Sequence, residues 1–278
     1  AMITNIGVSH IENLGSREGI LKSKLEILDG LKEGSPFIIN VDNDMLQTIL
    51  DNDNIMTKYN VITFGIESDN SNFKAVNIKE ENGSTSFDII YSVSKIIDET
   101  DGPTAVFSVN TQHITIPTIG IHNVYNALAA FTVGITLDIE PQTAANVFSA
   151  YVPAGMRQRN INVGGITSIE DCYNASPDSM KAALKTLANT TSNKKIAVLG
   201  DMLELGDFSK SAHEDVGKMV VENKIDYLLA YGNEAKYIVE SAKALGMENA
   251  FYFDDKDELS NKLLQIASKG DAVIFKAC

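Results

Sequence analysis

The sequence lacks several features that would set it apart from an ordinary globular protein. Its 278 residues include two cysteines, Cys172 and Cys278, and no Cys-x-x-Cys spacing of a metal site, so we expect reduced thiols in a cytoplasmic protein. No uncharged apolar run approaches the ~18 residues of a membrane span. The first residues also lack the basic and then apolar order of a secretory signal.

Positive charge is scarce. The chain has 23 Lys and Arg residues against 37 Asp and Glu residues, which gives a net charge of -14 at pH 7. This balance argues against nucleic acid or an anionic membrane as the partner, whereas an anionic small molecule would need only a local cationic pocket. With 44% hydrophobic and 22% charged residues, the chain is typical of a folded protein with room for two domains.

The first half predicts an α/β domain with a mixed sheet. Residues 72–118 contain four segments of alternating apolar and polar residues, separated by Asn-Gly and Gly-Pro turns, which predicts antiparallel strands appended to the α/β part. Short apolar runs flanked by turn residues predict further strands. These are expected over residues 2–7, 35–44 and 59–65, with helices over 17–31, 43–52, 120–137 and 141–151.

The second half has a more regular pattern. The stretch "VPAGMRQRN" contains Pro and Gly and predicts a domain boundary, so we divide the chain into residues 1–153 and 154–278. Beyond it, short strands alternate with helices, which predicts a parallel, doubly wound, Rossmann-like sheet that is cut at its end. Strands are expected over 166–174, 194–200, 225–232, 250–253 and 271–277, and helices over 177–190, 209–223, 233–246 and 255–268.

One predicted helix places a charge among its apolar residues. In "GSREGILKSKLEIL", a spacing of 100° per residue puts Lys24 in the middle of the apolar arc. Either the side chain snorkels with its ammonium in water, or burial lowers the pKa of an amine that acts as a nucleophile or carries a modification. His10 follows the first strand, at the edge where open α/β sheets bind ligands. A lone histidine is more often a structural hydrogen-bonding group.

The segment "NIGVSHIENLGSREGILKSKLEI" resembles the central-domain segment of the Mur ligases, the ATP-dependent peptide ligases of peptidoglycan synthesis. The resemblance implies that His10 is a magnesium ligand. It also implies that Lys24 is carbamylated and that its carbamate helps to hold Mg²⁺. The chemistry is consistent, because a desolvated neutral amine captures carbon dioxide and yields a carboxylate, a hard oxygen donor suited to this cation.

Three further residues match positions that contact ATP in the family. In "GIHNVYNALAA" the resemblance implies that Asn126 reads adenine, although an asparagine near a helix start is usually a cap. His122 and Asn123 of the same stretch are expected only to shape the turn. In "GMRQRN", Arg159 is implied to hold phosphate or ribose oxygens, the alternative being a solvated linker. In "IEDCYNASPDSM", Asp171 is implied to bind the ribose hydroxyls, the alternative being a turn or cap aspartate.

The run "DMLELG", with "DCYNASPDSM", resembles the branch of the family that adds D-alanyl-D-alanine. It fits the branches that add L-alanine, D-glutamate or a diamino acid less well. Asn174 and Ser176 are then expected to touch the incoming substrate. Asp201 and Glu204 are candidates either to face its amine or to cap the next helix, and His213 is expected at the surface.

The resemblance implies transfer of the ATP γ-phosphoryl group to the terminal carboxylate of UDP-MurNAc-tripeptide, followed by attack of the D-Ala-D-Ala amine. The phosphate-binding loop G-x-x-x-x-G-K-[ST] is absent, since Gly217-Lys218 is followed by Met219, so we expect it upstream. The chain is then a partial central ATPase domain, residues 1–153, and a C-terminal ligase domain, residues 154–278. It is expected to be inactive alone, and its truncated surfaces to allow self-association.

Two alternatives remain. Another ligase of the same superfamily, such as folylpolyglutamate synthetase, shares the histidine and lysine pattern, although "DMLELG" and "YNASPDSM" argue against it. By topology alone, the second half could also be a nucleotide- or partner-binding module without catalysis.

Overall fold

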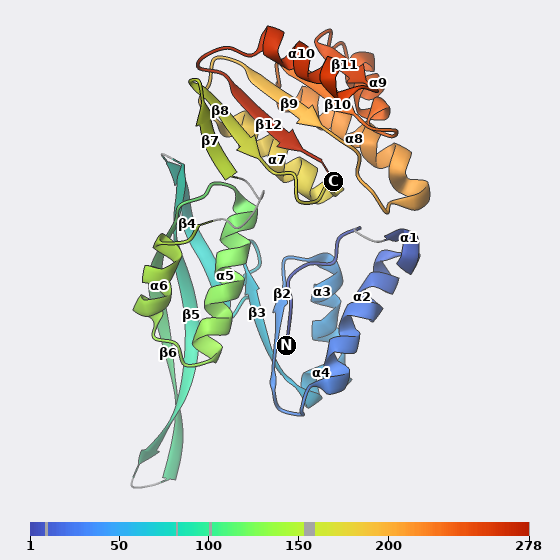
Figure 1. Ribbon diagram of the computed structural model, residues 1–278. Helices are drawn as coiled ribbons and strands as arrows, with labels where there is room; N and C mark the ends of the chain where they lie inside the picture. Colours follow the sequence, from blue (N-terminus) through green and yellow to red (C-terminus); the bar gives the residue numbers. More distant parts are fainter. Residues whose placement is uncertain (9–10, 82, 100–101, 153–158, 278) are drawn as a thin grey trace. The chain divides into compact units, whose positions relative to one another are not determined.

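The computed structural model describes residues 1–8, 11–81, 83–99, 102–152 and 159–277, with the backbone alone for 93–99 and 102–107. The chain forms two compact units, each with its own six-stranded sheet (Figure 1). Ala1–Ile6 and Arg17–Val152 form the first unit, and Gly7–Ser16 joins Pro153–Cys278 in the second. Our division after residue 153 leaves Gly7–Ser16 in the first domain. Within the described residues, no helix is both long and apolar enough to cross a bilayer.

The sheet of the first unit is mixed, as predicted. Its strand order is β1-β2-β3-β4-β5-β6, parallel from β1 to β4 and antiparallel from β4 to β6, so the antiparallel strands continue the α/β sheet. The strands are β1 (Met2–Ile3), β2 (Pro36–Asn40), β3 (Asn60–Gly65), β4 (Phe73–Glu81), β5 (Ser84–Glu99) and β6 (Gly102–Ile116).

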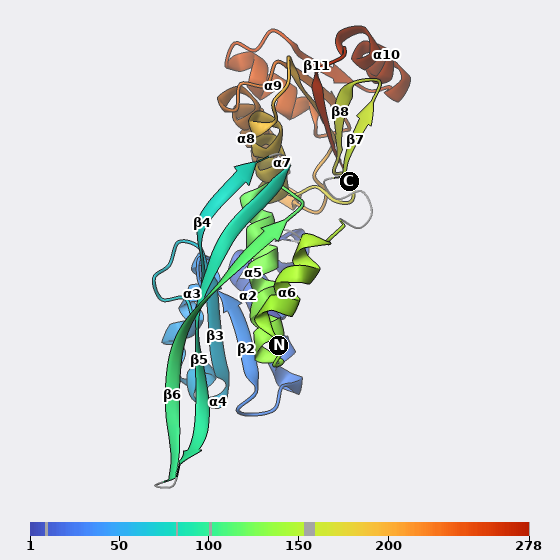
Figure 2. The same ribbon diagram turned by 90° about the vertical axis from the view of Figure 1, so that its left-hand side faces the viewer.

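Strands β5 and β6 form a long hairpin, whose pairing runs from Thr85 opposite Ile116 to Glu99 opposite Gly102 (Figure 2). The sequence predicts two strands, over "TAVFSV" and "HITIPT", where the structure has the single strand β6. The intervening residues Asn110–Gln112 stay paired with β5, so no turn separates the two segments.

Helices α5 (Ile121–Thr136) and α6 (Pro141–Ser149) pack against this sheet (Figure 2). Phe131 of α5 meets Phe73 and Tyr91 edge-on, with ring centroids 6.3 and 5.3 Å away, and the latter two rings stack at 5.4 Å. These contacts fix α5 against β4 and β5.

The other face of the sheet is also covered beside β2. Ile38 joins the core cluster under α5, while its neighbours Phe37 and Ile39, which point the opposite way along an extended strand, are fully buried as well. The remaining helices of the unit are α2 (Arg17–Leu25), α3 (Asp44–Gln47) and α4 (Asp53–Lys58), with 3₁₀ turns at Glu26–Gly30 and Thr48–Asp51.

One carboxylate ties the loop after β3 to α5. Asp42 accepts the backbone N–H groups of Ile66, Glu67 and Ser68 at 2.5, 3.0 and 2.8 Å, and the Tyr125 hydroxyl donates to it at 2.8 Å. Burial raises the pKa of Asp42, but these hydrogen bonds outweigh burial, so its pKa lies below the ordinary value. Burial, and then the bond to Asp42, raise the pKa of Tyr125. Asp42 is therefore a fixed anionic anchor.

The sheet of the second unit is parallel except at one edge. Its order is β11-β10-β9-β12-β8-β7, and only β7 runs antiparallel. The strands are β7 (Arg159–Val163), β8 (Ile166–Glu170), β9 (Lys195–Leu199), β10 (Tyr227–Tyr231), β11 (Ala250–Phe253) and β12 (Ala272–Lys276). The helices are α1 (Ile11–Leu14), α7 (Pro177–Asn189), α8 (Ser209–Glu222), α9 (Lys236–Ala244) and α10 (Lys256–Ile266), with a 3₁₀ turn at Gly206–Phe208.

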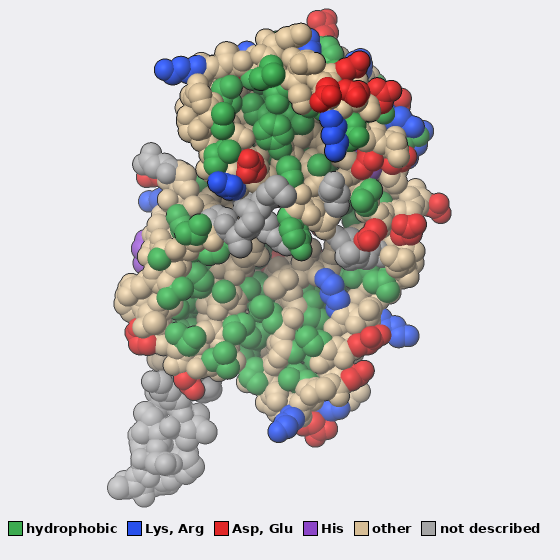
Figure 3. Space-filling model, viewed as in Figure 1, with side chains coloured by type: hydrophobic (Ala, Val, Ile, Leu, Met, Phe, Trp, Pro, Cys, Tyr) green, Lys and Arg blue, Asp and Glu red, His purple; other side chains and the backbone are tan. Residues whose placement is uncertain are grey.

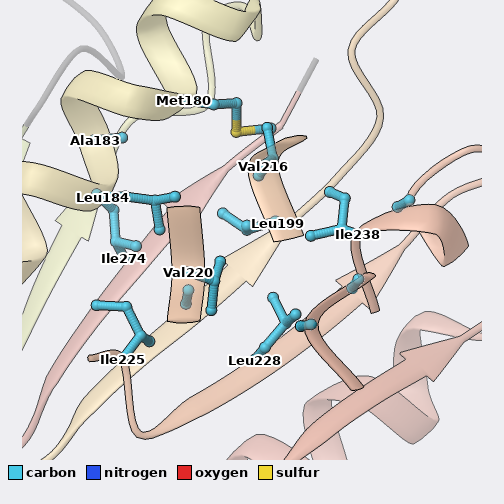
Figure 4. Packing of buried hydrophobic residues seen from close by; sticks show 14 of the residues in the cluster. Met180, Ala183, Leu184, Leu199, Val216, Val220, Ile225, Leu228, Ile238 and Ile274 are labelled. Atoms are coloured by element: carbon cyan, nitrogen blue, oxygen red, sulfur yellow. The ribbon is translucent and has the colours of Figure 1, made fainter. Parts of the chain in front are cut away.

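This sheet is doubly wound, as predicted. Leu199 of β9 and Leu228 of β10 lie in a cluster with residues of α7, α8 and α9, among them the labelled Met180 and Val220 (Figure 4). The alternate strand residues pack on the opposite face with α10, in a smaller cluster of Ile196, Leu229, Leu259 and Val273. Residues of one strand thus serve two cores, which explains their near-continuous apolar character.

Strand β7 was not predicted. We expected a linker up to residue 160, but residues 159–163 pair antiparallel with β8 through a turn in which Gly164 and Gly165 have φ of +61° and +87°. The missed signal is the Gly-Gly dipeptide between the apolar-polar stretches "NINV" and "ITSI", which is typical of a tight hairpin.

A close helix crossing yields a stability prediction. A Cβ on Gly217 of α8 would lie 2.3 Å from the Ile238 carbonyl oxygen of α9. Because this neighbour is helix backbone, it cannot rotate away. We expect Gly217→Ala to lower the free energy of unfolding of the second unit by about 1–3 kcal/mol in urea titrations. The matched control Gly30→Ala adds the same methyl with no atom within 4 Å, and equal losses in both variants would contradict the prediction.

The Asp42 anchor yields a pH prediction. Because its folded pKa lies below the unfolded value of about 3.9, it adds stability that is fully present above about pH 4 and is lost as the pH falls through the folded pKa. Asp42→Asn should therefore lower the urea midpoint at neutral pH and flatten its decline below about pH 4. The control is the exposed Asp29→Asn. A decline in Asp42→Asn as steep as in the wild type would count against the anchor.

Candidate functional site

Lys24 does not lie on the driest face of α2. Its side chain is exposed, and its Nζ donates to the Asn5 backbone carbonyl at 2.8 Å. The apolar arc predicted around Lys24 does not form, because α2 ends at Leu25 and residues 26–30 form a 3₁₀ turn, so the 100° spacing does not continue. Of the two alternatives for Lys24, the exposed side chain favours the snorkelling one. Ile27, which the wheel places on the apolar arc, is 49% exposed. Partial burial still lowers the pKa of Lys24, which favours the neutral amine.

His10 lies outside the described residues, and its segment belongs to the second unit, whereas Lys24 belongs to the first. Within the described part of the chain, no group of three or more His, Cys, Asp or Glu side chains is placed to hold a metal ion. The expected site combines His10 with a carbamate on Lys24, and His10 is not among the described residues.

A polar network that the sequence analysis missed surrounds the end of β1. The Arg17 guanidinium donates hydrogen bonds to both carboxylate oxygens of Asp44, at 2.7 and 2.5 Å, and to the Ile6 carbonyl at 2.9 Å. Asn43 donates to the Asn5 side-chain oxygen at 2.8 Å. Arg17 and Lys24 thus bind successive carbonyls of one segment, which fixes the chain just before Gly7–Ser16. The sequence signal for this network was the spacing of Arg17 and Lys24, which lie seven residues apart on one helix and therefore on the same side of it.

Asn126 lies exposed on α5. It is not the helix cap, because that position is Gly120, which has a φ of +104° and no side-chain cap. Asn123 donates to the Ile119 carbonyl at 2.8 Å, and the His122 ring covers Gly120 so closely that a Cβ there would lie 2.5 Å from it. Both residues shape the turn, as expected, and the Asn126 amide faces outward.

The carboxyl ends of β8 and β12 carry a buried ion pair in the second unit. Asp171 directly follows β8, and its Oδ2 lies 2.8 Å from Nζ of Lys276, the last residue of β12. Lys276 also donates to the Asn174 carbonyl at 2.6 Å. Asp171 is 8% exposed and Lys276 is 3% exposed. The alternative for Asp171 was a turn or cap aspartate. The structure shows an ion-paired aspartate instead.

Arg159 is the first residue of β7, on the strand next to β8. It is exposed, and its guanidinium lies 3.8 Å from the Glu170 carboxylate, the residue opposite it in the ladder. Glu170 immediately precedes Asp171, so the described residues place Arg159 and Asp171 at the same edge of one sheet.

The loop after Asp171 serves mainly to start α7. Ser176 is its N-cap and forms a capping box with Ser179, so its hydroxyl is engaged locally. The Asn174 side-chain oxygen accepts the Ala175 N–H at 2.8 Å, and this residue is exposed. Of the two expected substrate contacts, Asn174 is the more accessible.

Asp201 has a structural role. Its carboxylate accepts the backbone N–H groups of Asn233, Glu234 and Ala235 at 2.9, 3.0 and 2.8 Å and so closes the turn before α9. This supports the capping alternative for Asp201, although the helix concerned is not the next one. Glu204 is exposed, and its carbonyl accepts the Glu12 N–H at 3.4 Å, a contact within the second unit.

His213 was expected at the surface, but it is fully buried. Its Nε2 accepts the Met202 N–H at 3.0 Å, and its Nδ1 lies 2.7 Å from the Ser209 carbonyl. The ring is therefore neutral with the proton on Nδ1, and it links the loop after β9 to α8. The sequence signal for this burial was the helix face that His213 shares with the apolar residues Val216 and Val220.

The edge of the second unit is chemically suited to a polyhydroxylated anion. A carboxylate accepts hydrogen bonds from hydroxyl groups, and an exposed guanidinium binds phosphate. On the face that Figure 3 shows, Lys and Arg side chains are scattered and form no continuous cationic patch.

Lys276 is the residue that sequence reasoning missed at this edge. The strand "AVIFK" is apolar up to its last residue and places the Lys276 ammonium in a buried position. A lysine at the end of a strand that is buried on both faces needs a partner.

Comparisons with known proteins agree with this architecture. The family model "Mur ligase middle domain" matches residues 1–134, and "Mur ligase, glutamate ligase domain" matches residues 156–278. The chain is similar to the UDP-N-acetylmuramoyl-tripeptide--D-alanyl-D-alanine ligase of Bacillus subtilis (strain 168), with 37% identity over 280 residues, which are 100% of this chain and 56% of that protein. The Escherichia coli (strain K12) ligase of the same name is 31% identical over 267 residues, 95% of this chain and 53% of that protein.

The chain therefore spans about half the length of the curated relatives it matches. Among solved structures, MurF from Acinetobacter baumannii has the same fold, with a TM-score of 0.81, 24% identity, and coverage of 99% of this chain and 56% of that one. The two family models match in the order that the sequence predicts, with the central domain before the C-terminal ligase domain. The chain belongs to the Mur ligase family and carries its middle domain followed by its glutamate ligase domain.

Proposed function

We propose that the protein containing this chain is a cytoplasmic, ATP-dependent ligase that joins D-alanyl-D-alanine to UDP-MurNAc-tripeptide in peptidoglycan precursor synthesis. The observation that carries the proposal is the 37% identity, along all of the chain, to a relative with that name. Residues 201–206, "DMLELG", support this branch of the family. The geometry supports a nucleotide site, because an accessible guanidinium and a carboxylate lie at the carboxyl edge of the second sheet.

The reaction would proceed through an acyl phosphate. A carboxylate oxygen of the tripeptide bonds to the γ-phosphorus of ATP while the bond to the bridging oxygen breaks and ADP leaves. The D-Ala-D-Ala amine then attacks the acyl carbon, loses a proton, and inorganic phosphate departs from the tetrahedral intermediate. Both steps need groups that position the reactants and balance charge rather than a protein nucleophile.

Three side chains that the structure describes are proposed to contact the nucleotide. The outward amide of Asn126 would donate to and accept from the adenine edge. The Arg159 guanidinium would hold phosphate or ribose oxygens, since its only described ionic contact, with Glu170, is long at 3.8 Å. Asp171 would accept from the ribose hydroxyls.

His10 and Lys24 are proposed as the protein ligands of Mg²⁺. A lowered pKa leaves more of the Lys24 amine neutral and able to react with carbon dioxide. The resulting carbamate keeps one N–H for the Asn5 carbonyl, so the present contact is compatible with the modification. Magnesium bound there would offset negative charge during phosphoryl transfer.

Asn174 and Ser176 are proposed to contact the incoming dipeptide. Asn174 is exposed, and its side-chain oxygen already accepts the Ala175 N–H. A contact from Ser176 would share the hydroxyl that caps α7, so its contribution should be smaller.

The activity is tested by phosphate release from the full-length protein. With ATP, Mg²⁺, UDP-MurNAc-tripeptide and D-Ala-D-Ala, we expect one phosphate per peptide bond and none when either acceptor is omitted. Folate with glutamate, the substrates of the rival ligase, should release none. Release with folate, or ATP binding without turnover on any substrate, would contradict the proposal. Residues 1–278 alone should not turn over, because they lack the phosphate-binding loop, and stoichiometric release from them would contradict this expectation.

Adenine recognition is tested at α5. Asn126→Leu removes the amide from an exposed helix position, so stability should change by no more than about 0.5 kcal/mol, while KM for ATP should rise about tenfold through the lost hydrogen bonds. The matched control is Asn146→Leu, the same change at an exposed position of α6. An unchanged KM in Asn126→Leu, or an equal rise in the control, would rule out the adenine contact.

A further inference from the structure

The ion pair between Lys276 and Asp171 is unusual within its own sheet. Both side chains are almost wholly buried, and the strand that ends in Lys276 is otherwise apolar. Moving two charges out of water is so unfavourable that a buried pair commonly contributes no more stability than two apolar side chains of similar size. Stability alone is therefore a weak reason for this pair.

Lys276 uses its donors in a specific way. It binds Oδ2 of Asp171 at 2.8 Å and the Asn174 carbonyl at 2.6 Å. The same ammonium thus fixes the carboxylate and the turn that follows it. Among the described residues, no other side chain or N–H donates to the Asp171 carboxylate, and this side chain is 12% exposed. Lys276 thus holds Oδ2, and within the described part of the chain no donor binds Oδ1.

We propose that Lys276 is the positioning residue for nucleotide binding at this edge: it holds Asp171 by Oδ2 so that Oδ1 accepts hydrogen bonds from the vicinal hydroxyls of a ribose. This inference rests on the proposed function, which assigns the ribose to Asp171. Lys276 itself touches no ligand. Its ammonium pairs with the carboxylate in a buried position, and its second contact ties the same ammonium to the turn that follows Asp171.

A second ion pair of the same sheet provides the matched control. Lys194 lies 3.1 Å from the carboxylate of Asp271, which is 1% exposed, but this pair precedes β9 and β12 and so sits at their amino ends. Lys194→Met removes the cationic partner of a buried carboxylate, although Lys194 itself is 34% exposed, and it does not touch the carboxyl edge. It separates a loss of stability from a loss of ribose recognition.

The experiment compares kcat/KM for ATP with kcat/KM for 2′,3′-dideoxy-ATP in the full-length protein. The ratio reports the hydroxyl contacts, and a general loss of stability does not change it. We expect Asp171→Asn and Lys276→Met each to lower the ratio about tenfold. The double variant should lower it no further, because each single change already removes the same ribose contact. Lys194→Met should leave the ratio unchanged. Lys276→Gln, which retains an N–H donor, replaces Lys276→Met if the latter does not fold, and should lower the ratio as well.

The two possible failures are distinguishable. If Asp171→Asn lowers the ratio and both Lys276 variants leave it intact, the inference is overturned while the nucleotide role of Asp171 stands. If Asp171→Asn leaves the ratio intact, the ribose assignment in the proposed function is overturned, and the inference with it. A fall in the ratio for Lys194→Met equal to that for Lys276→Met would assign the effect to stability and would also overturn the inference.

Discussion

The ion pair at the carboxyl edge of the second sheet depends on strand order. Lys276 and Asn174 are 102 residues apart in sequence, yet they are in contact because β12 inserts between β8 and β9. Parallel strands bring their carboxyl ends to one edge, so residues that follow different strands become neighbours there. The hydrophobic clusters on the two faces hold the strands in this order. The packing of apolar residues thus determines where the charges meet.

The contrast between Lys24 and Lys276 shows where the criterion of a buried charge applies. A charged side chain in an apolar stretch needs an explanation, but periodicity identifies the stretch only while the helix continues. Helix α2 ends at Leu25, and Lys24 is an exposed residue that binds a backbone carbonyl. In a strand that is covered on both faces, most positions are buried, and there the criterion applies to Lys276, which is 3% exposed.

Much of the fold could be predicted from the sequence. The alternation of strands and helices along the chain predicted the doubly wound sheet of the second unit. The alternation of apolar and polar residues predicted the antiparallel strands of the first sheet. Three features escaped prediction because they depend on tertiary pairing: the edge strand β7, the unbroken β6, and the grouping of Gly7–Ser16 with the second unit. Local patterns mark where elements form, whereas pairing depends on residues far away in sequence.

The candidate site was predictable in part. Asn126, Arg159 and Asp171 were selected by resemblance, and their exposure or charge partners are compatible with the proposed roles. The structural functions of Asp201, His213 and Ser176 were harder to see, because each binds backbone groups that only the folded chain brings near. A polar residue type indicates that a partner is needed, but not which partner it has.

The proposed recognition of a ribose at the carboxyl edge of the second sheet depends on an aspartate that a buried lysine holds in place. The most direct measurement is a crystal structure of the full-length protein with a non-hydrolysable ATP analogue and Mg²⁺. The account predicts ribose hydroxyl oxygens within hydrogen-bond distance of Asp171 Oδ1, with Lys276 still bound to Oδ2. A ribose bound away from Asp171, or a Lys276 ammonium that has left the carboxylate to touch the nucleotide itself, would contradict it.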